Sequence, residues 1–398
     1  MMSNAADAHF VPRSGPSWRD PFSMYAALRD HDPVHEIPST GADPSYFVLA
    51  RFADVLAAAV DTQTFSSAQG LTFTYGDMES TGLEAPIVMM DPPAHTALRK
   101  LATKRFTPRQ VREVEPMVRA FVKERVERLR EQGEGDIVEL LFKPLPSLVV
   151  AHSLGVPQPD RGRFDRWSEA IVAAQAGGNI LSAADAVGEL FGYFTRLIEK
   201  RRGDPADDMI STLVHAQLEG EPVSMAKLLG VAFTMVTGGN DTTTGLLGVS
   251  AALLTENRDQ RQRLIDDSSL MKNAIEEFLR LSSPVQGLAR TTTRDVDLHG
   301  KTIPAGRKVM LLYASGNRDE REFGKTAADC DLTRPIRRHL AFSYGAHHCI
   351  GAALARLQAR VALEELLARC PDFEVDVEAA QFAPGNFVRR YRSLPFRA

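Results

Sequence analysis

Helical periodicity dominates this chain and limits the folds that it can adopt. Between residues 111 and 129, apolar side chains recur every three or four positions with Arg, Lys and Glu between them, and Gly133 follows. The spacing predicts an amphipathic helix of roughly five turns that ends at the glycine. Similar patterns predict helices near residues 160–176, 183–201, 225–255, 258–268, 270–282 and 351–369.

Strand-like runs are short and few: Tyr46–Ala50, Val296–Leu298, Val309–Tyr313 and Phe373–Val377. Pro304–Gly306 separates two of them, which predicts a hairpin turn. The sequence shows no repeat and no Pro/Gly-rich seam. We therefore expect a mainly α fold with small β-sheets, a single domain over residues 1–398, and a loosely ordered segment at residues 1–19.

Composition excludes several classes of protein. The 398 residues carry 47 Lys and Arg against 51 Asp and Glu, so the basic excess that is typical of nucleic-acid binders is missing. Only three cysteines are present, which excludes a disulfide scaffold. Neither a signal peptide nor a run of about 18 apolar residues is visible, so we expect a cytoplasmic protein with no membrane partner.

The most specific segment is FSYGAHHCIG, residues 342–351, which a helical pattern follows directly. Cys349 therefore lies beside a helix N-terminus, where N–H groups and the helix dipole favour a negatively charged sulfur. Glycines at 345 and 351 would let the backbone approach a flat ligand. A thiolate held in this way suits an axial haem ligand. A buried structural cysteine and a zinc site with the two adjacent histidines are the alternatives, although no CxxC pair supports zinc.

A polar cluster, TGGNDTTTG, interrupts the apolar pattern of residues 225–255. One interpretation is two helices joined at Gly238–Asn240, with Asp241 or Thr242 as the N-cap. The other is one helix that glycine and hydroxyl groups widen locally.

Both segments resemble signatures of the cytochrome P450 family. Residues 342–351 are similar to its haem-binding loop, F-G-x-G-x-H-x-C-x-G, except that Ser343 replaces a glycine. The polar cluster is similar to its [AG]-G-x-[DE]-T-[TS] motif. The resemblance runs from about Asp20 to Phe396 and is strongest to soluble, class I bacterial members such as those of actinobacteria and mycobacteria.

The resemblance implies a triangular-prism cytochrome P450 fold, haem b and the axial thiolate Cys349. It implies a haem-thiolate monooxygenase that inserts one oxygen atom of O2 into an apolar small molecule, by hydroxylation or by N- or O-dealkylation. In such an enzyme Asp241 would relay protons and Thr242 would donate a hydrogen bond, which favours the single helix. The neighbouring glycines would leave room for dioxygen.

Further residues match positions with assigned roles in the family. The cofactor contacts, chiefly to the two propionates, would be His95, Arg99, Arg290, His347 and Gly351. Glu277, Arg280 and Arg334 would form a buried structural ion network. The apolar substrate pocket would be lined by Leu71, Phe73, Tyr75, Met89, Met235, Gly238, Val285, Leu288 and Phe387. Gly177 and Gly178 suggest a flexible lid over it.

The chain is too short for an additional flavin domain and lacks the cysteine set of an iron–sulfur cluster. A separate ferredoxin and its NAD(P)H-dependent reductase are therefore the expected electron donors. A basic run is either their docking patch or a solvated helix face: Arg99, Lys100, Lys104, Arg105, Arg109 and Arg112. A peroxide-driven peroxygenase, a haem-binding sensor and a helical protein without haem are the alternative functions. Asp241 and Thr242 argue against the first two.

Overall fold

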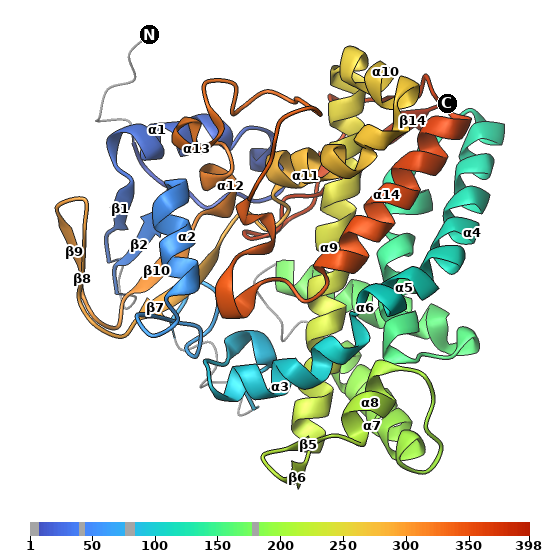
Figure 1. Cartoon of the computed structure of the whole chain (residues 1–398), viewed down its shortest axis with the longest axis horizontal. Coiled ribbons are helices and arrows are strands. Elements are labelled where there is room, and N and C mark those ends of the chain that lie inside the picture. The colour runs from blue at the N-terminus through green and yellow to red at the C-terminus, as the bar shows by residue number, and fades with distance from the viewer. Residues whose placement is uncertain (1–7, 40–43, 76–83, 177–182) are drawn as a thin grey trace.

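The computed structural model describes residues 8–39, 44–75, 84–176 and 183–398, and helices make up most of it (Figure 1). The α-helices are α1 Phe22–His31, α2 Phe52–Val60, α3 Ala94–Ala102, α4 Pro108–Gln132, α5 Pro144–Leu154, α6 Arg161–Ala176, α7 Ala184–Gly203, α8 Met209–Val214, α9 Met225–Glu256, α10 Arg258–Asp266, α11 Met271–Ser282, α12 Tyr313–Gly316, α13 Glu320–Phe323 and α14 Ala352–Arg369. Short helical turns that matter below are η2 Gly15–Arg19, η9 Leu340–Phe342 and η10 Gly345–His347.

The strands form small sheets. They are β1 Val34–Ile37, β2 Tyr46–Leu49, β3 Phe65–Ser66, β4 Glu134–Asp136, β5 Gln217–Leu218, β6 Glu221–Pro222, β7 Leu288–Thr292, β8 Val296–Leu298, β9 Lys301–Ile303, β10 Lys308–Leu311, β11 Glu374–Val375, β12 Gln381–Phe382, β13 Tyr391–Ser393 and β14 Pro395–Arg397. The largest sheet has the order β1-β2-β10-β7-β3, in which only β2 and β10 run parallel.

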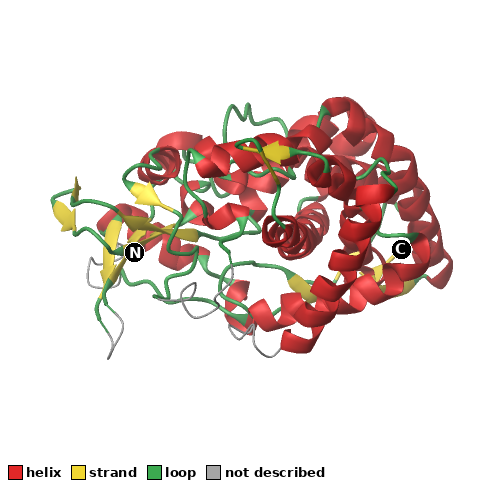
Figure 2. Ribbon diagram, turned by 90° about the horizontal axis from the view of Figure 1, so that it is seen from below, coloured by secondary structure: helices red, strands yellow, loops and turns green. Residues whose placement is uncertain are grey.

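The five-stranded sheet and the longer helices occupy different ends of the molecule. The five-stranded sheet gathers at one end, and the larger helices gather at the other (Figure 2). The long helix α9 runs through the helical part, with α14 beside it and α4 on the far side of α14 (Figure 1). The loop before α14 lies between the two parts, so residues from both can reach it.

Helix α4 confirms the helix predicted over residues 111–129. Thr107 caps its first turn, and Gly133 ends it in a left-handed conformation with φ of 75°. One stripe of the helix is buried: Val114, Val118, Val122, Val126 and Leu129. The six other predicted helices are also present, as α6, α7, α9, α10, α11 and α14.

Helix α9 is one continuous α-helix of 32 residues, so the interpretation as two helices is wrong. Hydroxyl groups in the polar cluster donate to carbonyls one turn back: Thr237 to Phe233 and Thr242 to Gly238, at 3.0 and 2.8 Å. These bonds satisfy the hydroxyl groups inside the helix, so the polar residues need not end it.

Two other expectations, both about strands, are wrong. The hairpin turn lies at His299–Gly300, between β8 and β9, whereas Pro304–Gly306 connects strands of different sheets. Tyr313 begins α12 instead of ending a strand. Residues 15–19 form η2, in which Trp18 is buried and its indole N–H donates to the carbonyl of Gly385. The N–H of Gly15 also donates to the carbonyl of Ala383, and Arg19 donates to the carbonyl of Val377, so several contacts hold this segment against the body.

No helix in the described part of the chain combines the length and apolar character that crossing a bilayer requires.

Candidate active site

The loop before α14 is held in place by its own backbone. The N–H of Cys349 donates to the carbonyl of Phe342 at 2.8 Å, which closes the loop. Gly345 has φ of 68°, and a Cβ there would lie 3.1 Å from backbone atoms of α2. The glycine is therefore required by the backbone conformation and by the close approach of α2. The result is a loop that presents Cys349 directly before α14.

Ser343 has φ of 55° and ψ of −171°, a region that is essentially reserved for glycine. It stands at the position where the cytochrome P450 signature has glycine. The hydroxyl of Tyr313 donates to its Oγ at 3.3 Å, and both residues are buried. The structure thus explains the glycine of the signature, and the hydrogen bond offsets part of the strain.

Cys349 has an exposed side chain, and neighbouring protein groups partly desolvate its sulfur. We call the space in front of this sulfur the recess. Burial raises the pKa of the thiol, whereas the N–H groups of Gly351 and Ala352 and the guanidinium groups of Arg99 and Arg356 oppose this. Coordination to a metal ion deprotonates a thiol outright, so the donors around the sulfur suit a metal-bound thiolate.

The residues expected to contact propionates gather beside this loop. The rings of His95 and His347 lie 4.2 Å apart, and Nε2 of His347 lies 3.2 Å from the hydroxyl of Ser67. Burial, with Arg290, His95 and Arg99 nearby, lowers the pKa of His347 to about 3. Both histidines are thus neutral donors near pH 7, next to two arginines.

The two arginines of this cluster bond to backbone carbonyl groups, whereas Asp91 acts on His95. Arg99 donates to the carbonyl of His348 and Arg290 to that of Ala289, and no carboxylate in the described part of the chain pairs with either. Arg290 is only 2% exposed, and Nδ1 of His95 is buried without a hydrogen-bond partner. A buried guanidinium without a counter-ion is costly. The residues therefore fit a ligand that brings two carboxylates to the recess beside Cys349, as haem does.

Zinc finds no support, because no cluster of metal-ligating side chains occurs among the described residues.

Asp241 and Thr242 lie on α9 and are both partly buried. The hydroxyl of Thr242 donates to Gly238 within the helix, so its lone pairs remain available. Burial raises the pKa of Asp241, and Arg390 and Lys143 oppose this. Arg390 forms an ion pair with Asp241 at 2.7 Å. Sequence reasoning missed Arg390, because no motif connects the C-terminal segment to α9.

The expected structural ion network is formed. Both Nε and Nη2 of Arg280 donate to Glu277 at 2.7 Å, and Nε of Arg334 donates to the same carboxylate at 3.2 Å. Glu277 and Arg280 are completely buried, and carbonyl groups of the segment before the loop accept the remaining guanidinium protons. Far from the recess, these residues support the fold.

The nine residues expected in the substrate pocket come from both parts of the molecule. Eight have partly buried side chains, and Gly238 is exposed. Phe73 packs against Phe387, with ring centroids 5.6 Å apart. Tyr75 is engaged elsewhere, since its hydroxyl donates to the carbonyl of Ser45 and accepts from the N–H of Lys308. Gly177 and Gly178, the expected lid, lie outside the described residues.

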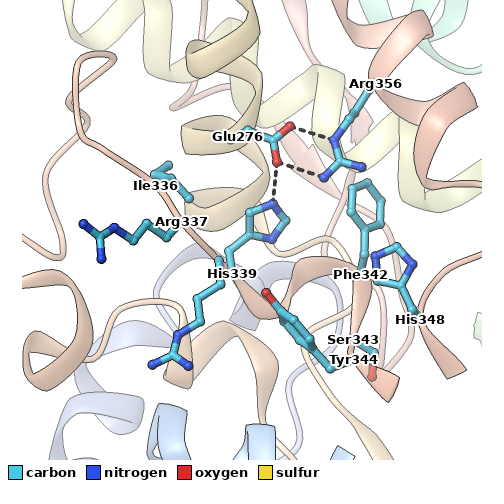
Figure 3. A pocket seen from close by; sticks show the side chains of 10 residues that line it. Glu276, Ile336, Arg337, His339, Phe342, Ser343, Tyr344, His348 and Arg356 are labelled. Carbon is cyan, nitrogen blue, oxygen red and sulfur yellow. Dashed lines mark hydrogen bonds and ion pairs between the residues drawn. The ribbon is translucent and has the colours of Figure 1, made fainter. Parts of the chain in front are cut away.

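Sequence reasoning also missed a polar hollow behind the loop (Figure 3). Glu276 is one of the residues that line it, and it accepts hydrogen bonds from Arg356 and His339. Burial would raise the pKa of Glu276, but these two partners outweigh it and lower the pKa to about 2. The remaining lining residues are Ile336, Arg337, Arg338, Phe342, Ser343, Tyr344 and His348.

Comparison with known proteins shows the family of the chain. The family model of cytochrome P450 matches residues 36–383. Over its whole length the chain is 57% identical to cytochrome P450 130 of Mycobacterium tuberculosis, covering 99% of that protein. It is 35% identical to the vitamin D(3) 25-hydroxylase of Pseudonocardia autotrophica, covering 96% of this chain and 94% of the relative.

Solved structures give the same result. A Mycobacterium marinum cytochrome P450 in complex with pseudoionone superimposes with a TM-score of 0.88 at 32% identity, covering 100% of this chain and 98% of that one. Its fold is therefore the fold of this chain. The family uses haem b with an axial cysteine thiolate. The chain belongs to the cytochrome P450 family of monooxygenases.

Proposed function

We propose that Cys349 is the axial ligand of haem b and that the enzyme inserts one oxygen atom of O2 into an apolar small molecule. The observation that carries this proposal is the arginine and histidine cluster beside Cys349, whose two arginines have no carboxylate partner in the described part of the chain. Arg99, Arg290 and the two histidines would hold the propionates. Haem supplies O2 binding and activation, and a thiolate ligand favours O–O cleavage.

Asp241 and Thr242 would deliver the protons that this cleavage needs. The carboxylate of Asp241 can take up a proton from water and pass it on, while Thr242 can hold a water molecule by hydrogen bonding. The bond from Thr242 to Gly238 fixes the hydroxyl oxygen and leaves its lone pairs open to a donor. A peroxygenase or a sensor would not need this relay.

The substrate would be an apolar molecule of moderate size. The partly buried aliphatic and aromatic side chains of the expected pocket support this, and Phe73 and Phe387 form one wall. Similar proteins support the same substrate class: one relative is a vitamin D(3) 25-hydroxylase, and cytochromes P450 of similar structure have been solved with pseudoionone or testosterone. Terpenoid and steroid-like compounds are therefore the first to test, with oxygen insertion or dealkylation as the reaction.

Electrons would come from a ferredoxin and its NAD(P)H-dependent reductase in the cytoplasm. The hollow behind the Cys349 loop supports docking there, because the exposed side chains of Arg337 and Arg338 line it and a ferredoxin is acidic. Arg338 already pairs with Glu322 and Arg356 with Glu276, so Arg337 is the cation of this set outside such a pair. The basic run of α3 and α4 contributes less than its sequence suggests. Arg105 and Arg109 already pair with Asp207 and Glu113, which leaves Lys100, Lys104 and Arg112 as its exposed cations outside those pairs.

The relay is tested by the ratio of product formed to NAD(P)H consumed, with a surrogate ferredoxin system and a substrate found by its spin-state shift. Thr242→Ala should still consume electrons but release hydrogen peroxide instead of product. Asp241→Asn should slow turnover by about 10²–10⁴-fold, the usual effect of losing a positioned proton donor. Wild-type coupling in the first variant and a wild-type rate in the second would contradict the relay.

A further inference from the structure

The proton relay proposed above assigns no role to Arg390, a charged residue that lies directly against Asp241. Its Nε is 2.7 Å from Oδ1 of Asp241, and the two side chains are only 14% and 16% exposed. Two charges in such surroundings depend on each other, because removing either leaves the other buried without compensation. The ion pair thus ties the acid of α9 to the C-terminal segment.

Two glycines of α9 allow this approach. A Cβ at Gly245 would lie 2.9 Å from the carbonyl oxygen of Arg389, and a Cβ at Gly248 would lie 2.9 Å from the ring of Tyr391. Both glycines share a helix face with Asp241, at spacings of four and seven residues. Segment 389–391 therefore packs against that face along its length, which brings Arg390 to Asp241.

The backbone around Arg390 is fixed from several sides. The N–H of Arg389 donates to the carbonyl of Pro284 at 2.8 Å, and the carbonyl of Arg390 accepts from Ala383 at 3.0 Å. The side chain of Arg389 points elsewhere, since its Nε donates to the carbonyl of Trp18. Because hydrogen bonds fix the backbone at Arg390, its guanidinium group approaches Asp241 from a fixed Cα position.

Among the described residues, Lys143 is the other charged group that affects the pKa of Asp241. Lys143, just before α5, is the second cation that opposes the effect of burial on its pKa, and Nζ of Lys143 pairs with Glu169 at 2.5 Å. Arg390 is the cation in contact. Without Arg390, only the weaker effect of Lys143 would oppose the burial that raises the pKa of the Asp241 carboxyl.

We propose that Arg390 is the positioning residue of the proton relay: it holds Asp241 in one orientation and keeps its carboxyl charged until a proton arrives from water. This inference rests on the proposed role of Asp241. A relay group must accept a proton and release it again. Arg390 stabilises the charged form of the Asp241 carboxyl, which is the form that accepts a proton. When the proton binds, the carboxyl becomes neutral and the ion pair is lost.

The first test measures the Asp241 carboxyl itself. Infrared difference spectra against Asp241→Asn, recorded over pH in the haem-loaded enzyme, report its protonation. Arg390→Met should increase the proton affinity of Asp241 about tenfold or more. Arg390→Lys should return the proton affinity of Asp241 most of the way to the wild-type value. The matched control is Arg392→Met, at an exposed position two residues further along the chain. An unchanged affinity in Arg390→Met would overturn the inference.

The second test separates this inference from the proposed function. If Arg390 acts through Asp241, the double variant Arg390→Met, Asp241→Asn should turn over at the same rate as Asp241→Asn alone. In the single variant Arg390→Met, the pH midpoint of the turnover rate should move to higher pH. A further loss of rate in the double variant would contradict a role through Asp241. A wild-type rate in Asp241→Asn would instead refute the relay, while the infrared result would still report whether Arg390 controls the carboxyl.

Discussion

Ser343 combines a strained backbone with a hydrogen bond, and the two effects can be separated by substitution. Ser343→Ala keeps the positive φ but loses the bond from Tyr313, whereas Ser343→Gly relieves the strain. Strain of this kind costs about 1–3 kcal/mol, so Ser343→Gly should be more stable than Ser343→Ala by about that amount. Denaturant unfolding of both variants checks this. Equal stability would mean that the loop relaxes without cost.

Arg99 and Arg290 should each contribute to haem retention, because each lacks a protein carboxylate in the described part of the chain. Loss of one charge-assisted bond to a propionate should cost about 1–3 kcal/mol. Transfer of haem to an apo-haem acceptor protein measures this for Arg99→Ala and Arg290→Ala. Arg112→Ala, on an exposed part of α4, is the control and should retain haem like the wild type. Equal transfer rates in all variants would refute the propionate roles.

At the scale of elements, Glu276 connects α11, α14 and the segment before the Cys349 loop through Arg356 and His339 (Figure 3). Its folded pKa, about 2, lies below the ordinary value of 4.5. The ionised carboxylate therefore stabilises the fold above pH 4.5, and this contribution is lost as the pH falls from 4.5 toward 2.

Glu276→Gln should accordingly lower the free energy of unfolding by up to about 3 kcal/mol near pH 7. The difference from the wild type should shrink as the pH falls below 4.5. Denaturant titrations from pH 7 to pH 3 measure it, with Glu113→Gln as the exposed control on α4. A difference that does not depend on pH would show that packing, not charge, is lost.

The helices and strands also differ in how well the sequence predicts them. The repeating apolar stripes predict α4 and α9, because a helix with one buried face leaves that pattern. The hairpin at His299–Gly300 could not be read in the same way, since its turn residues are less distinctive than Pro304–Gly306. Strand pairing depends on residues far apart in the chain, and the sequence pattern carries no such information.

At the scale of the whole molecule, the same limit applies to the site. Local motifs point to Cys349, Asp241 and Thr242 and to the propionate contacts, because each is embedded in a short segment with its own chemistry. Arg390 and the hollow that Glu276 lines have no local signal. They exist because the fold brings the C-terminal segment to α9, and α14 to α11.

The central claim is that Cys349 is the thiolate ligand of haem, and the ferrous–CO spectrum tests it most directly. The wild type should show the red-shifted Soret band of thiolate ligation, and Cys349→Ala should lose it. Cys330→Ala and Cys370→Ala should keep it, since neither residue belongs to the loop that presents Cys349. An unchanged band in Cys349→Ala would contradict the assignment.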